Sequence, residues 1–225
     1  MTTFTRYYLT ESGELLSESV EYEPDDTLLS EQAGADTYAK DIRGIARVVW
    51  QGLPLDGYSL MWDTVGLGIT AAWAQGAASC GIAEEDLTLD ERIRRDMLVN
   101  EQRGHIMGFL DWVYAHRRDG PDKLKQSVIL ARAAIWGNRW SQAYQVSMTM
   151  ACANQKTMWM LGPTEHCDSC LKLNGKAKRN SYWQRMGILP RVPGAPYLKC
   201  QGYNCQCTLE LTDEPLSKGP LPRLP

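Results

Sequence analysis

The chain has 225 residues, of which 44% are hydrophobic, and a net charge of −3, which is typical of one or two folded globular domains. This balance excludes a protein that binds polyanions over its whole surface. No apolar run approaches the roughly 20 residues of a membrane-spanning helix. The charge is segregated, because residues 1–36 hold nine acidic side chains and one basic, whereas residues 156–199 hold eight basic and two acidic.

The first part of the chain, residues 1–36, is predicted to form an acidic N-terminal arm. A short strand is expected at about residues 5–10, followed by a turn at Ser12–Gly13. The polar, acidic start predicts that no secretory signal peptide is present.

A helical body is predicted over residues 37–155. Helices are expected over residues 36–51, 59–79, 88–118 and 121–153. The second is rich in glycine and alanine, which lets another backbone approach closely, and Thr88 and Glu91 form a capping box that starts the third. Two apolar faces are predicted to point inward: Ile93, Met97, Ile106, Leu110 and Val113 in the third helix, and Leu124, Val128, Ala131, Ile135 and Tyr144 in the fourth. Short turns between long amphipathic helices favour antiparallel packing.

A small α+β module is predicted over residues 156–213. Strands at 157–161 and 206–212 are expected to pair as a short β-hairpin, with a helix at 181–186 that Gly187 ends. The tail, residues 214–225, is rich in proline and is predicted to be extended or disordered. The fold class is therefore mainly α, with an antiparallel helical body followed by this small α+β module.

Five of the seven cysteines fall within this module, as a C-x2-C pair and a later C-x4-C-x-C group. Two thiolate clusters at this separation predict a closed tetrahedral zinc site, which would be structural because four protein thiolates leave no open position. Two disulfides with one free thiol are the alternative. The preferred ligands are Cys167, Cys170, Cys205 and Cys207, with Cys200 as the fifth candidate.

Three further residues bear on the thiol chemistry. His166 precedes the first pair, and we expect it either to orient that loop or to replace one thiolate as a ligand. Cys80 and Cys152 lie in apolar helical patterns, and they are predicted to be unreactive core residues.

Basic side chains surround the cysteines, interleaved with Tyr182 and Trp183. They form either a surface that contacts phosphates or an ordinary solvated face. The candidate binding residues are Lys172, Lys176, Lys178, Arg179, Arg185 and Arg191.

No catalytic motif is present, so the sequence predicts that the chain is not an enzyme and takes no small-molecule substrate. Two functional classes are favoured instead. One is a structural assembly protein, and the other is a zinc-dependent nucleic-acid-binding module.

The cysteine module carries a composite motif. From Lys156 it reads K-x2-W-x-L-G-x-T-x-H-C-x2-C-L-x-L-N-G, followed by S-x-W at Ser181 and by C-x-G-Y-N-C-x-C-x-L-E from Cys200. Over residues 130–213 this pattern resembles the phage head morphogenesis family, the minor head proteins of the phage Mu protein F type. The segment Arg132–Trp140 resembles the last long helix of that family.

The resemblance implies a virion protein of low copy number that is assembled in the host cytoplasm and acts in head assembly. Its expected partners are the portal protein, the major capsid protein or both, and also packaged DNA, with no membrane. The position of Cys200 is often not cysteine in that family, so the resemblance leaves open which four thiolates bind zinc.

Overall fold

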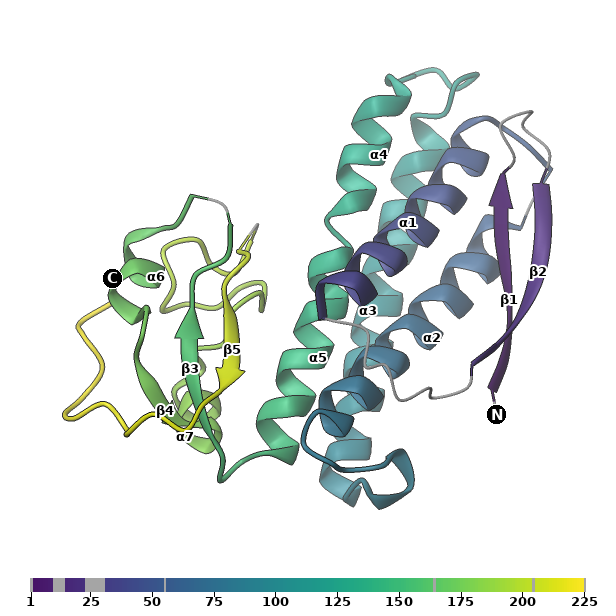
Figure 1. Cartoon of the computed structure of the whole chain (residues 1–225). Coiled ribbons are helices and arrows are strands. Elements are labelled where there is room, and N and C mark those ends of the chain that lie inside the picture. Colours follow the sequence, from purple (N-terminus) through teal and green to yellow (C-terminus); the bar gives the residue numbers. More distant parts are fainter. Residues whose placement is uncertain are drawn as a thin grey trace. The chain divides into compact units, whose positions relative to one another are not determined.

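The computed structural model describes residues 2–9, 15–22, 31–54, 56–163, 165–203 and 205–224, and in residues 2–22 only the backbone (Figure 1). The α-helices are α1 (Glu31–Trp50), α2 (Gly57–Ala78), α3 (Leu89–Ala115), α4 (Gln126–Ala134), α5 (Gly137–Ala151), α6 (Asp168–Leu173) and α7 (Asn180–Met186). The strands are β1 (Thr2–Leu9), β2 (Leu15–Tyr22), β3 (Lys156–Met160), β4 (Ala177–Arg179) and β5 (Thr208–Leu211). The fold is mainly α with a small antiparallel sheet, as the sequence predicts.

The chain divides into two compact units, each built from separate stretches of sequence. The first unit comprises residues 1–68 and 99–137, and the second comprises residues 69–98 and 138–225. Helices α2 and α3 therefore contribute to both units. The predicted module, which begins near residue 156, lies within the second unit together with α5 and the last turns of α2. No described helix combines the length and the apolarity that crossing a membrane requires.

The first unit contains a β-hairpin in the region predicted as an acidic arm. Strand β1 pairs antiparallel with β2, from Thr2 opposite Tyr22 to Leu9 opposite Leu15. The sequence predicted one short strand here and missed the second, because the glutamates of β2 hide its period-two pattern. The predicted turn at Ser12–Gly13 lies outside the described residues.

The helices of the first unit bury one face each. In α1 this face includes Ile42, Ala46 and Val49, which are at most 2% exposed. α1 packs against α4, and the indole Nε1 of Trp50 donates a hydrogen bond to the carbonyl oxygen of Leu124 at 3.0 Å. This contact ties the end of α1 to the segment that leads into α4.

Helix α3 begins where its capping box predicts. The backbone nitrogen of Thr88 donates to the Glu91 carboxylate at 2.8 Å, and the Glu91 nitrogen donates to the Thr88 hydroxyl at 3.3 Å. The predicted apolar face is correct only in its second half. Ile93 and Met97 are 49% and 56% exposed, because the buried row instead runs through Gln102, a polar side chain that apolar periodicity does not detect.

The single helix predicted over residues 121–153 is two helices. After α4 the backbone nitrogen of Ile135 donates to the carbonyl oxygen of Arg132, three positions earlier, which is the hydrogen bond of a 3-10 turn. The next helix, α5, begins at Gly137, a poor helix former. The predicted inner face of the first half is also wrong. Val128 and Ile135 are each 44% exposed, whereas Ile129 is fully buried.

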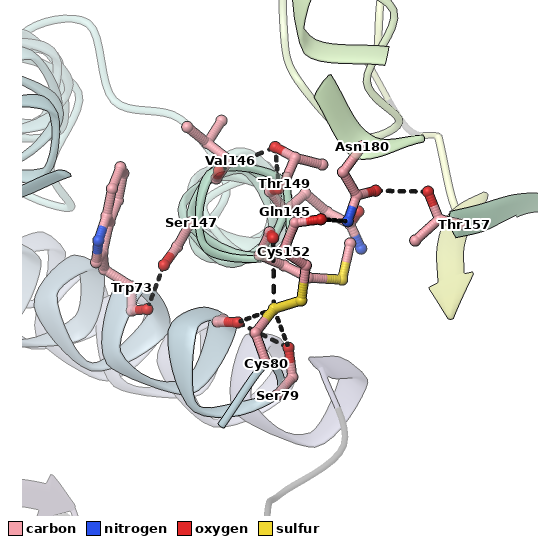
Figure 2. The surroundings of a disulfide bond; sticks show 12 residues. Trp73, Ser79, Cys80, Gln145, Val146, Ser147, Thr149, Cys152, Thr157 and Asn180 are labelled. Carbon is pink, nitrogen blue, oxygen red and sulfur yellow. Dashed lines mark hydrogen bonds between the residues drawn. A yellow bond between two sulfur atoms is a disulfide. The ribbon is translucent and has the colours of Figure 1, made fainter. Parts of the chain in front are cut away.

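In the second unit, α5 packs closely on the last turns of α2. A Cβ at Gly76 would collide with the backbone carbonyl of Tyr144, so only glycine permits this approach. The hydroxyl of Ser147 donates to the carbonyl oxygen of Trp73 at 2.6 Å (Figure 2). The small-residue pattern of α2 thus serves helix packing, as predicted.

A disulfide joins Cys80, just after α2, to Cys152, just after α5 (Figure 2). Cys152 is buried, as predicted, but the expectation of two separate core thiols is wrong, because the two residues are paired. Close packing brings their Cα atoms to 5.6 Å, inside the range that a disulfide spans. No local pattern in the sequence signals this pairing across 72 residues.

We expect this disulfide to stabilise the oxidised chain. Loop-closure entropy for a cross-link of this span predicts a loss of about 4 kcal/mol in the free energy of unfolding when Cys80 and Cys152 are both replaced by alanine. Chemical denaturation of both proteins with and without reductant measures this loss. The difference should disappear in reductant, and a difference that persists there would assign it to packing of the side chains.

The module within the second unit is a three-stranded antiparallel sheet in the order β4-β3-β5. The predicted pairing of the first and last strands is confirmed, with Trp159 opposite Leu209. β4 was not predicted, because it has only three residues and no alternating pattern. The indoles of Trp159 and Trp183 are fully buried beside each other, with ring centroids 5.9 Å apart. They form the apolar centre of the module.

A hydrogen-bond bridge connects the module to the end of α5. Asn180, fully buried at the start of α7, accepts from the Thr157 hydroxyl and donates from Nδ2 to the carbonyl oxygen of Cys152 at 3.1 Å (Figure 2). The amide thereby holds β3 of the sheet against the chain next to the disulfide.

The proline-rich tail follows β5 in an extended form and lies against the module. Ser217 exchanges hydrogen bonds with the backbone of Ala177 in β4. The ammonium of Lys178 donates to the carbonyl oxygens of Ser217 and Gly219, each at 2.7 Å. The tail is therefore part of the folded module rather than a separate segment.

Candidate metal centre

The cysteines of the module are presented by two loops and one short helix. Cys167 is the residue before α6, and Cys170 lies in its first turn. The other three come from the chain that follows α7 and leads into β5. Gly162 allows the two sides to meet, because a Cβ there would collide with the carbonyl of Gln206. Residues far apart in sequence thus converge at one place.

The five thiols gather into two groups of three that share Cys170. Within each group, all sulfur atoms lie within 4.8 Å of one another. Cys170 and its partners in the second group are at most 6% exposed, whereas Cys167 and Cys200 are half-buried. We call Cys167, Cys170 and Cys200 the outer triad, and Cys170, Cys205 and Cys207 the inner triad.

This arrangement is able to hold a metal ion. Four ligands placed tetrahedrally at about 2.3 Å from an ion lie about 3.8 Å from one another. The sulfurs of Cys167 and Cys170 are 3.5 Å apart, and each triad spans distances that small adjustments bring to this value. All the predicted cysteine ligands are therefore brought together, and in the structure these five thiols form no disulfide with one another.

The thiols of the cluster differ in pKa. Hydrogen bonds from the Cys170 and Cys207 thiols lower the pKa of Cys205, because they stabilise its thiolate. The pKa of Cys170 is raised, chiefly by its hydrogen bond to the sulfur of Cys205. Its hydrogen bond to Cys207 and its burial raise this pKa further. Burial raises the pKa of Cys200 to about 11. A bound cation would displace these protons, so metal affinity should fall as the pH falls.

His166 lies at the edge of the inner triad. Its Nε2 is 3.0 Å from the carbonyl oxygen of Gly162, and its Nδ1 is 3.7 Å from the sulfur of Cys207. A carbonyl oxygen only accepts, so Nε2 carries the hydrogen, and in the neutral imidazole the lone pair of Nδ1 faces the sulfur of Cys207. Metal-binding histidines are commonly oriented by such a backbone carbonyl.

The side chain of Arg191 binds the backbone of the C-x-C turn, residues 205–207. Its guanidinium donates to the carbonyl oxygens of Cys207 and Gln206 at 3.1 and 3.0 Å, and to the hydroxyl of Ser141 in α5 at 3.1 Å. Arg191 is only 6% exposed, so this predicted binding residue faces the protein interior. The role of Arg191 is therefore set by its hydrogen bonds to these groups and not by its position in a basic stretch of sequence.

The other predicted basic residues remain partly or fully exposed. Lys172 donates to the carbonyl oxygen of Arg223, Lys178 to the tail, and Arg179 to the carbonyl of Asn154. Arg185 lies over the ring of Tyr182, with 5.5 Å from its guanidinium carbon to the ring centroid. Carbonyl groups and rings are uncharged partners, so the positive charge of this face is not neutralised by these contacts.

Comparisons of the chain with protein-family models, with curated proteins and with solved structures found no match. The cysteine cluster, the basic face and the sequence motif are therefore the features of the chain that bear on its function.

Proposed function

We propose that this chain is a structural protein of phage head morphogenesis, a minor head protein whose C-terminal module is held together by Zn²⁺. The observation that carries the proposal is the convergence of five motif cysteines into one cluster beside a small tryptophan core. This core is small, and metal binding supplies folding free energy in such modules.

Zinc is the ion that the donor set favours. Thiolates with one nearby imidazole are typical of structural zinc sites, whereas magnesium and calcium prefer oxygen ligands. The inner triad is buried, and a site closed by protein ligands is structural, so the proposed role of the ion is to hold the module together rather than to catalyse a reaction.

The proposed partners are the portal, the major capsid protein and packaged DNA. The acidic segment at the start of the chain suits a basic protein surface, and the basic face of the module suits DNA or an acidic portal surface. We define this basic face by its exposed or half-buried cations, Lys172, Lys176, Lys178, Arg179 and Arg185.

Quantitative mass spectrometry of purified virions tests the assembly role. We expect the chain in virions at a few copies per portal ring, and cross-linking should join its module to portal or capsid peptides. Finding the chain in infected cells and not in virions would reject a virion component and favour a zinc-dependent nucleic-acid-binding module.

A charge-reversal variant tests DNA as the partner. Lys176→Glu, Arg179→Glu and Arg185→Glu together should weaken DNA binding and reduce the salt dependence of log K by about 0.9 for each phosphate that the protein no longer neutralises. Fluorescence anisotropy with duplex DNA over a salt series measures both. Arg94→Glu, at an exposed arginine of α3, is the matched control. Unchanged binding by the triple variant would exclude this face as the DNA-binding surface.

A further inference from the structure

We infer that the cysteine cluster binds two metal ions, with the thiolate of Cys170 bridging them. The inference rests on the proposed metal-stapled module and extends it from one ion to two. Its starting observation is that Cys170 belongs to both triads. Among the described residues, no set of four candidate ligand atoms lies within 4.8 Å of one another, which is what one tetrahedral ion would gather.

The donor count favours two ions. One tetrahedral ion uses four of the six donors at this place and leaves at least one thiol in a buried or half-buried position without a metal. With Cys170 shared, the outer ion has three thiolates. The inner ion has three thiolates, and the imidazole Nδ1 of His166, 3.7 Å from the sulfur of Cys207, is the donor beside this triad that could move in as its fourth ligand. The donors are Cys167, Cys170, Cys200, Cys205, Cys207 and His166.

Charge favours the same arrangement. Five thiolates carry five negative charges, and burying uncompensated charge costs several kcal/mol per ion in real proteins. Two divalent ions reduce the net charge of the cluster to −1, whereas one ion would leave −3 or require a thiol to stay protonated. The guanidinium of Arg191, which binds the carbonyls of Gln206 and Cys207, supplies a further positive charge nearby.

The two ions would differ in exposure. The inner triad is buried, with Cys170 and Cys207 each 1% exposed, so its ion is closed to solvent. The outer triad includes half-buried Cys167 and Cys200, and its ion keeps a fourth position that water can occupy. A chelator should therefore remove the outer ion first and the inner ion only as the module opens.

Metal stoichiometry tests this inference directly. The full chain is purified in reductant, loaded with Zn²⁺ and desalted, and zinc per chain is measured by elemental mass spectrometry and by native mass spectrometry. We expect two ions per wild-type chain. Cys200→Ser, at the rim of the outer triad, should retain one ion and keep its far-ultraviolet circular dichroism. Cys205→Ser should retain one ion at most.

The outcomes separate this inference from the proposed function. One ion per wild-type chain would overturn the two-ion site and leave the metal-stapled module intact, and no bound ion would overturn both. Two ions in the wild type and in Cys200→Ser alike would also overturn it, because the second ion would then lie elsewhere. Titration with Co²⁺ gives an independent readout, since two equivalents should be needed to saturate the thiolate charge-transfer band, and one equivalent would contradict the inference.

Discussion

Replacing Cys170 with serine is expected to release the bound metal and to expose the chain beyond about residue 155 to protease. Cys170 is 1% exposed and is the one thiol that both triads share. Apparent binding free energies of structural zinc are about 10–16 kcal/mol, which exceeds the whole stability of most small domains. Loss of this thiolate should therefore unfold the module rather than merely weaken the site.

Limited trypsin digestion followed by mass spectrometry measures this effect. The module contains potential cleavage sites at Lys172, Lys176 and Arg185, which folding protects, and cleavage there should become faster by orders of magnitude in Cys170→Ser. Cys200→Ser is the matched control, because Cys200 belongs only to the half-buried outer triad. Full metal content together with full protease resistance in Cys170→Ser would show that the module does not depend on metal binding by Cys170 and would contradict the proposed site.

Local signals in the sequence predicted local structure well. The capping box of Thr88 and Glu91 and the stop at Gly187 each depend on a few adjacent residues, and both occur as predicted. The pairing of β3 with β5 also follows from period-two patterns on either side of the cysteines. The cysteine cluster was predictable for the same reason, since C-x2-C and C-x-C spacings present thiols together before any tertiary contact forms.

Features that depend on distant partners could not be predicted. The disulfide of Cys80 and Cys152 exists because Gly76 lets α5 lie close to α2. The buried row of α3 passes through Gln102, whose polarity hides its position from any apolar pattern. The sharing of Cys170 by two triads is likewise set by the path of the chain through two loops and α6, so spacing alone favoured one group of four ligands.

The second large effect is expected at Arg191. This residue has φ of 59°, a left-handed conformation that costs a non-glycine residue about 1 kcal/mol or more. The strain is offset by the guanidinium, which is buried and donates to two carbonyls of the C-x-C turn and to Ser141. A side chain with fewer donors would leave these acceptors without a partner.

We expect Arg191→Met to destabilise the module by about 3 kcal/mol, because hydrogen bonds from a charged donor contribute about 1.5–3 kcal/mol and buried acceptors left unpaired add to the loss. Arg191→Lys should lie between wild type and methionine, since an ammonium keeps the charge but not the planar fork of donors. Urea unfolding followed by tryptophan fluorescence, to which the buried Trp159 and Trp183 contribute two of the eight indoles, measures this loss, and Arg185→Met, at an exposed arginine, is the control.

Zinc competition with a chromophoric chelator completes the test of Arg191. If the guanidinium positions the turn that carries Cys205 and Cys207, Arg191→Met should lower zinc affinity as well as stability, by the roughly 10–100-fold typical of residues that orient metal ligands. A variant that unfolds at the wild-type urea concentration and keeps the wild-type zinc affinity would contradict this role. Arg191 would then be a basic residue whose burial serves neither the turn nor the metal.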